Sequence, residues 1–149
     1  MSAAGSRDPY LAVIRRFNRA GVLYVVVGMS GINYYARDPA HAFGTMDYDF
    51  FLEPSLKNIQ KATRSLKALG FDIGTSEGEW KESDLRRVVR DQKTFTATTL
   101  DGLIVEILLK VSGYPFSGMA NDAATIPVHG VPVKVGRLNK LLRSKKLAG

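Results

Sequence analysis

The fold is decided by the stretch LYVVVGMSG at residues 23–31. Its first five residues are apolar and rich in valine, which is typical of a central strand buried on both faces. Gly28 ends this run, and a short helix is expected at 30–36. A glycine turn between a strand and a helix presents backbone N–H groups to an anion. The stretch therefore predicts a phosphate-binding turn at Gly28 to Ser30, in which the Ser30 hydroxyl is a further donor. The alternative is an ordinary strand-to-helix turn with Ser30 as the N-cap.

A second stretch, TMDYDFFL at residues 45–52, alternates carboxylate and aromatic side chains before an apolar end. Successive side chains of a strand point to opposite faces, so Asp47 and Asp49 share one face. Two like charges on a core strand are costly unless a cation neutralises them. Carboxylate oxygens suit Mg²⁺ and Mn²⁺, so the pair predicts a metal site. The alternative is that Asp47 caps the strand while Asp49 faces solvent.

A third acid, Glu106, interrupts the otherwise apolar run LIVEILL at residues 103–109. Glutamate is rarely buried without a partner, so its position suggests a third metal ligand. The alternative is an outward-facing residue on an edge strand. Asp101 precedes Gly102 in a hairpin-turn signal, which already accounts for that acid.

The remaining pattern alternates helices and strands. Asp8 and Pro9 are expected to open a first helix that Gly21 ends, and Pro54 is expected to open another that Gly70 ends. The other expected segments are strands at 85–89, 94–99 and 103–109, a loop at 113–124, strand pieces within 126–135 around Gly130, and a helix at 137–147. This order predicts a single domain over residues 1–149 of the α/β or α+β class, with helices packed on a mixed sheet.

Composition narrows the class of protein. The chain of 149 residues has no cysteine, so disulfides and thiolate metal sites are excluded. No apolar run approaches the roughly 20 residues that span a membrane, and residues 1–9 lack a secretory pattern. We therefore expect a cytoplasmic protein that does not enter a membrane.

Positive charge is concentrated at the end of the chain. The formal net charge is +7, yet residues 123–149 contain no acid. Such a segment attracts polyanions, such as tRNA, although a solvated helix face is equally expected. Its basic residues are Lys134, Arg137, Lys140, Arg143, Lys145 and Lys146.

The glycine turn, the paired aspartates and the later acid, in this order, resemble the nucleotidyltransferase superfamily of the DNA polymerase β type. The signature of that superfamily is G-[GS], then D-x-[DE], then a third carboxylate. Residues 28–31 and 45–49 are similar to the G-G-x-A and R-x-T-x-D-x-D patterns of minimal nucleotidyltransferases, including the toxin-like AbiEii group. The strand and helix at 131–145 also resemble that group, and the resemblance spans residues 22–147. The chain departs from it at Met29, at Phe43 in place of arginine, and in a longer segment between Met29 and Asp47.

The resemblance implies a nucleotidyltransferase fold and two-metal transfer of a nucleotide from an NTP to a hydroxyl of an RNA, protein or small molecule. Asp47 and Asp49 would hold Mg²⁺, and Glu106 would share the second ion. The turn at Gly28, Met29 and Ser30 would bind the terminal phosphates. Lys145 would neutralise charge that develops there, although a surface lysine is equally expected.

Two other interpretations remain open. The departures at Met29 and Phe43 favour a non-catalytic module that binds a nucleotide or a partner chain, such as half of a toxin–antitoxin pair. A basic RNA-binding domain with structural acids is the third interpretation. His41 and His129 lack metal-ligand spacing and are expected in loops, and Trp80 is expected to pack or to lie at an exposed edge. At this length, acceptor recognition is expected to involve a partner chain.

Overall fold

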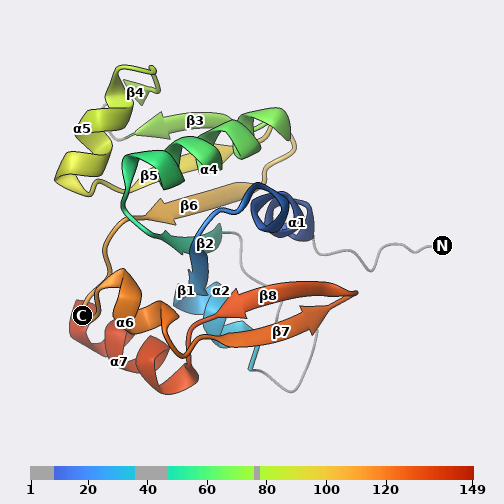
Figure 1. The fold of residues 1–149 in the computed structure, drawn as a ribbon, viewed down its shortest axis with the longest axis vertical. Helices are drawn as coiled ribbons and strands as arrows, with labels where there is room; N and C mark the ends of the chain where they lie inside the picture. Colours follow the sequence, from blue (N-terminus) through green and yellow to red (C-terminus); the bar gives the residue numbers. More distant parts are fainter. Residues whose placement is uncertain (1–8, 36–46, 76–77) are drawn as a thin grey trace.

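A single mixed β-sheet organises the protein, which we describe from a computed structural model covering residues 9–35, 47–75 and 78–149. Eight described strands lie in the order β4-β3-β5-β6-β2-β1-β8-β7 (Figure 1). β1 pairs antiparallel with β2 and parallel with β8, while β2 pairs parallel with β6. The strands are β1 (Tyr24–Val27), β2 (Asp47–Leu52), β3 (Asp72–Thr75), β4 (Gly78–Glu79), β5 (Phe95–Thr98), β6 (Ile104–Leu108), β7 (Ala124–Val128) and β8 (Val131–Val135).

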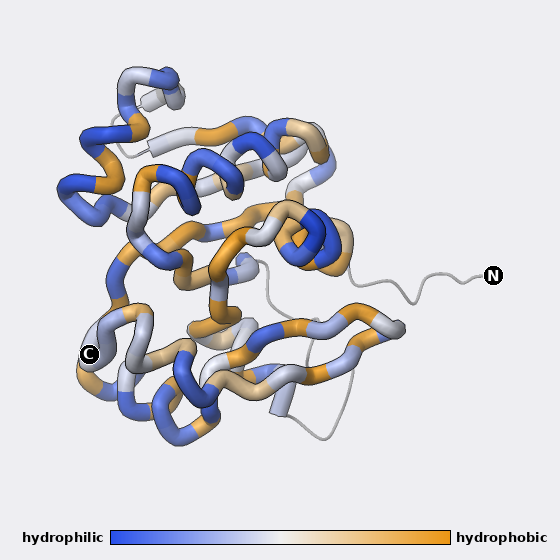
Figure 2. The backbone as a smooth tube through the Cα atoms, viewed as in Figure 1, coloured by the Kyte–Doolittle hydropathy of each residue, from blue (hydrophilic) through white to orange (hydrophobic). Residues whose placement is uncertain are grey.

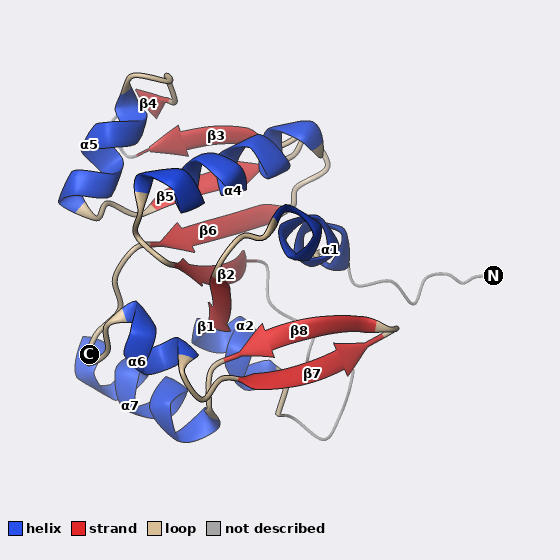
Figure 3. Cartoon of the chain, viewed as in Figure 1, coloured by secondary structure: helices blue, strands red, loops and turns tan. Residues whose placement is uncertain are grey.

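Helices pack on both sides of this sheet, which confirms the predicted mixed α/β class (Figure 3). α1 and α4 contact each other, and α2 contacts both β2 and α7. The described helices are α1 (Leu11–Ala20), α2 (Gly28–Asn33), α4 (Leu56–Ala68), α5 (Asp84–Asp91), α6 (Phe116–Ala120) and α7 (Leu138–Ala148). Within the described residues, no helix is long and apolar enough to cross a membrane.

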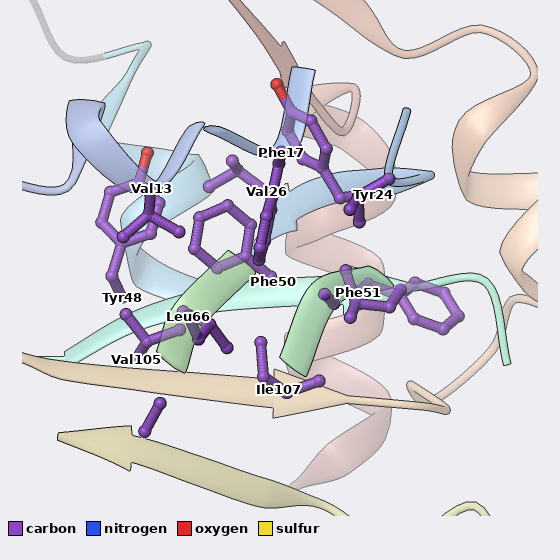
Figure 4. Packing of buried hydrophobic residues seen from close by; sticks show 14 of the residues in the cluster. Val13, Phe17, Tyr24, Val26, Tyr48, Phe50, Phe51, Leu66, Val105 and Ile107 are labelled. Atoms are coloured by element: carbon purple, nitrogen blue, oxygen red, sulfur yellow. The ribbon is translucent and has the colours of Figure 1, made fainter. Parts of the chain in front are cut away.

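Alternation along β2 separates the two faces of the sheet. Phe50 packs edge-on against Phe17 of α1 (Figure 4), and Tyr48 stacks on Tyr10 at the start of α1 with ring centroids 4.7 Å apart. Phe51 points the other way and meets Phe116 of α6 at 5.3 Å. Because side chains alternate, Asp47 and Asp49 lie on the Phe51 face, away from α1.

The strand predicted at 85–89 is wrong, because these residues lie in helix α5. Leu85 and Val88, three residues apart, are buried, while Arg86 and Arg90 are exposed. That spacing fits one turn of a helix, and Asp84 places a negative charge in its first turn. The β-branched pair at 88–89 suggested a strand, but the tertiary packing favours the helix.

Several element boundaries also differ from the prediction. Pro54 does not open α4, since Ser55 is the N-cap and its side chain accepts a hydrogen bond from the Asn58 N–H. The segment 113–124, expected as a loop, contains α6. The helix expected at 30–36 begins earlier, at Gly28. The predicted hairpin turn at Gly102 and the end of α1 at Gly21 are confirmed.

The aromatic and histidine expectations follow the packing of the sheet. Trp80 is buried and its ring lies 5.2 Å from that of Phe95, so it packs in the core. His129 is exposed in the turn between β7 and β8, where its φ is 49°. His41 and Asp8 lie outside the described residues.

A buried asparagine ties β1 to α4. The Asn58 side chain is 4 % exposed, accepts from the Leu23 N–H at 2.8 Å, and donates to the carbonyls of Leu23 and Glu53. We expect Asn58→Ala to lower the free energy of unfolding by about 2 kcal/mol, because the Leu23 N–H loses its acceptor while the carbonyls of Leu23 and Glu53 keep the N–H groups of Glu53 and Ser55 as donors. Urea denaturation measures this. Asn139→Ala, at an exposed site, is the control and should cost under about 0.5 kcal/mol, and equal losses would show that these hydrogen bonds contribute nothing.

Candidate active site

Asp49 and Glu106 lie side by side on neighbouring parallel strands. The register of β2 and β6 pairs these two residues directly. β6 lies between β5 and β2, so Glu106 is not on an edge strand and that alternative is wrong. Glu106 alternates with the buried residues Val105 and Ile107, which places it on the same face as Asp49. The predicted association of these two acids is therefore present in the structure.

The two carboxyl groups interact strongly. Burial, as the largest cause, together with the negative charge of Glu106 and a hydrogen bond to it, raises the pKa of Asp49 to about 7. The Ser30 hydroxyl acts in the opposite direction, and the charge of Asp47 adds a smaller upward effect. A carboxyl pair that resists full ionisation is a site at which a cation is favoured.

Asp47 stands apart from this pair. It begins β2 on the same face as Asp49, but it is exposed. Within the described residues, no group of three His, Cys, Asp or Glu side chains is arranged to hold a metal ion. The structure thus brings Asp49 and Glu106 together and leaves Asp47 at the open end of the strand, where its charge still reaches Asp49.

Ser30 is buried beneath the acid pair and holds Asp49. Its Oγ accepts a hydrogen bond from the Asp49 N–H at 2.8 Å. The same hydroxyl lies 3.3 Å from Asp49 Oδ2 and 3.2 Å from the Val27 carbonyl, and it is a donor toward both. The sequence predicts that Ser30 donates to a phosphate, whereas in the structure its hydroxyl is engaged with β1 and β2. Ser30 therefore positions the Asp49 carboxyl.

Gly28 begins α2 in the left-handed backbone region, with φ at 64°. A Cβ built there would lie 3.1 Å from Asp49 Cγ and would overlap the carboxylate oxygen. Glycine is therefore required at position 28 for two reasons. It adopts the positive φ without strain, and it leaves room for the Asp49 carboxyl. The turn that the sequence pattern assigns to a phosphate lies directly against the acid pair.

We expect Gly28→Ala to destabilise the protein by about 2 kcal/mol or more and to displace the Asp49 carboxyl. The matched control is Gly70→Ala, since Gly70 also has a positive φ of 90° but has nothing within 4 Å of a built Cβ. That variant should lose only the conformational part, about 1 kcal/mol. Urea denaturation measures both. A Gly28→Ala/Asp49→Ala double variant should recover part of the loss, and strict additivity would contradict a direct interaction between the two positions.

A pocket of about 420 Å³ adjoins the acid pair on the same face of the sheet. Leu108 follows Glu106 by two residues and lines this pocket, as do Val27 and Gly28. Most of the residues that line the pocket are apolar, and lysine and serine residues line the rest. The remaining lining residues are Met29, Lys110, Val111, Ser112, Met119, Leu141, Ser144, Lys145 and Ala148.

Lys145 reaches the glycine turn from α7. Its Nζ lies 3.1 Å from Met29 Sδ, and both residues line the pocket. The proximity of the last helix to the turn, which the sequence predicts for Lys145, is therefore present. Lys140 on the same helix is engaged elsewhere, since its Nζ lies 2.8 Å from Asp122 Oδ1.

Lys110 and Ser112 are pocket residues that were not predicted from the sequence. Glu106 and Leu108 have the same parity, so alternation along β6 continues the acid face toward the pocket, and Lys110 lies just beyond the end of that strand. That signal was available in the sequence. Met119 was not predictable, because the helix α6 that carries it was expected to be a loop.

Comparison with protein-family models and with curated proteins gives no information on this site. No protein-family model matches the chain, and no curated protein matches it. The function is therefore argued from the residues and their arrangement.

Proposed function

We propose that this protein transfers a nucleotide from an NTP to a hydroxyl of an RNA, protein or small-molecule acceptor, with Mg²⁺ or Mn²⁺ as the metal. The observation that carries the proposal is the pairing of Asp49 with Glu106 against the turn at Gly28. Placing a half-buried carboxyl pair beside a glycine turn brings a cation-binding group within reach of a phosphate-binding one. These are the two groups that nucleotide transfer requires.

The donor set fits a hard divalent cation. The pKa of Asp49 is raised to about 7 by burial and by Glu106, so a bound cation would relieve the repulsion that disfavours ionisation of Asp49. Asp49 and Glu106 would hold the ion, and exposed Asp47 would complete the ligands by turning toward it. The bound metal supplies polarisation of the α-phosphate and activation of the acceptor hydroxyl.

The other residues of the site position the Asp49 carboxyl and supply positive charge for the substrate phosphates. Ser30 fixes the Asp49 backbone and carboxyl, so the acid is oriented before the substrate arrives. The N–H groups at the start of α2 have no acceptor within that helix and suit the terminal phosphates. Lys145 and Lys110, at the pocket, supply positive charge for the phosphates. The apolar lining, including Leu108 and Leu141, suits a base or sugar.

The test is incubation of the protein with Mg²⁺ and each of the four labelled NTPs, against total tRNA and cell protein. We expect covalent label on one acceptor class, with release of pyrophosphate. Absence of transfer with every nucleotide, alongside an active nucleotidyltransferase in the same assay, would falsify the proposal.

A second candidate is a module that binds nucleotides or a partner chain, such as half of a toxin–antitoxin pair, without turnover. The favouring observation is Met29, which is 41 % exposed and places its sulfur against Lys145 where a phosphate would approach. Calorimetry with NTP and Mg²⁺ separates the candidates. Tight binding without pyrophosphate release supports the module, and loss of that binding in Asp49→Ala locates it at the same site.

A further inference from the structure

The outer surfaces of α1 and α4 carry only positive charge. Residues 9–23 and 54–71, which contain these helices and their ends, include no acid. α1 and α4 pack against each other, so their charged residues lie on neighbouring helices. Both helices carry strongly hydrophilic residues along the tube in Figure 2. We name this surface the basic helical face, and its residues are Arg15, Arg16, Arg19, Lys57, Lys61, Arg64 and Lys67.

The amphipathic pattern of both helices produces this face. α1 buries Leu11, Ile14 and Phe17, and α4 buries Ile59 and Leu66. The charged residues occupy the remaining positions, and those of α4 recur at the three- and four-residue spacing of one helix side.

Most of this charge is not neutralised. Lys67 forms an ion pair with Glu82 at 3.8 Å. Among the described residues, the other six members of the face have no acid within ion-pair distance. The basic end of the chain is similar in this respect, because Lys140 pairs with Asp122 and Arg137 donates only to the Asp122 carbonyl. Among the described residues, six basic residues of the face and five at the end of the chain have no acid within ion-pair distance.

The types of side chain exposed on the basic helical face indicate which class of partner it binds. Within residues 9–23 and 54–71, Leu23 is the single large apolar side chain that is exposed, and one leucine is little to insert into a lipid layer. The aromatic residues at these helices, Tyr10 and Phe17, are buried and cannot stack on unpaired bases. A surface dominated by charge, without exposed aromatic groups, suits the regularly spaced phosphates of a nucleic-acid duplex.

The face lies on the opposite side of the sheet from the acid pair. Phe50 and Tyr48 of β2 point to α1, whereas Asp47 and Asp49 point away from it. A polyanion on α1 and α4 is therefore separated from the repelling carboxylates by the sheet. It also leaves the pocket beside Gly28 open.

We propose that the basic helical face binds the phosphate backbone of double-helical RNA. The binding surface follows from the charges alone. The choice of RNA over DNA rests on the proposed function, in which an RNA is one of the acceptor classes.

The experiment compares two triple variants that remove the same charge from different places. Arg15→Gln/Arg19→Gln/Arg64→Gln neutralises exposed residues of the face, and Lys134→Gln/Arg143→Gln/Lys146→Gln neutralises exposed residues at the end of the chain. Fluorescence anisotropy with a labelled RNA hairpin, whose stem has about 20 base pairs, is measured over a salt series without NTP or metal. Circular dichroism and thermal melting confirm that each variant is folded.

We expect the first variant to bind the hairpin about tenfold or more weakly and to reduce the salt slope by about three, one for each phosphate that the protein no longer neutralises. The second variant should bind within about twofold of the wild type. Asp49→Asn should also retain binding, so a failure of nucleotide transfer and a failure of RNA binding are observed separately.

Four outcomes would overturn the proposal. The first is absence of hairpin binding by the wild type at low salt. The second and third are an equal loss of hairpin affinity in both triple variants and a loss of hairpin affinity in the second variant alone. The fourth is binding of the same residues to anionic vesicles but not to RNA. The last measurement is the same anisotropy titration with a DNA duplex of matching sequence. Equal affinity for it would overturn the assignment to RNA.

Discussion

Replacing Asp49 with Asn, or Glu106 with Gln, is expected to reduce the rate of nucleotide transfer by about 10³-fold or more. Each change keeps the size of the side chain and removes the negative charge that holds the cation. Because the two residues are paired across β2 and β6, they act as a unit. The double variant should therefore be little worse than either single one.

The measurement is the single-turnover rate of label transfer at saturating Mg²⁺ and NTP. Asp72→Asn is the matched control, since Asp72 is exposed on β3 and away from the acid pair. It should retain the wild-type rate within about twofold. Retention of more than about a tenth of the activity in Asp49→Asn would remove Asp49 from the catalytic residues.

The same Asp49→Asn variant is expected to be more stable than the wild type at pH 8, by about 2 kcal/mol. Burial and the Glu106 charge raise the pKa of Asp49 from 3.8 to about 7 in the folded protein. The folded state thus binds this proton more tightly than the unfolded state does, so wild-type stability falls as the pH rises from about 4 to about 7. Three pKa units correspond to about 4 kcal/mol, and the partial exposure of Asp49 reduces the effect. Asparagine does not titrate and avoids the loss.

Urea denaturation at about pH 4 and about pH 8 tests this expectation. The stability difference between Asp49→Asn and the wild type should be near zero at the lower pH and should favour the variant at the higher pH. Asp72→Asn should show no such gain. A variant that is less stable than the wild type at pH 8 would show that the Asp49 charge stabilises the fold, which is the opposite of the expected effect.

Local patterns predicted the acids of this site better than its surroundings. Asp47, Asp49 and Glu106 stand out because alternation along a strand has a period of two and each of them interrupts or begins an apolar run. The association of Asp49 with Glu106 was predicted, but their direct register on neighbouring strands was not predictable, since strand order and register depend on contacts between distant segments. The separation of Asp47 from that pair likewise required the structure.

The missed features share one physical origin. Leu85 and Val88 fit a strand by propensity, and their burial on one side of α5 is decided by packing against α4. The basic helical face combines charges from helices about 40 residues apart, so neither helix alone indicates it. The charge at the end of the chain was prominent in the sequence because it is contiguous, yet part of it is neutralised by Asp122.

The close approach of Gly28 and Asp49 also constrains how this chain can evolve. An acid at position 49 occupies the space that any side chain at position 28 would need. Natural variants that keep the carboxylate should therefore keep the glycine, whereas lineages that lose the acid are freed from half of that constraint. Loss of activity would then leave a paired trace at positions 28 and 49, with Asp49 replaced first and Gly28 drifting afterwards toward Asn or Asp, which tolerate a positive φ.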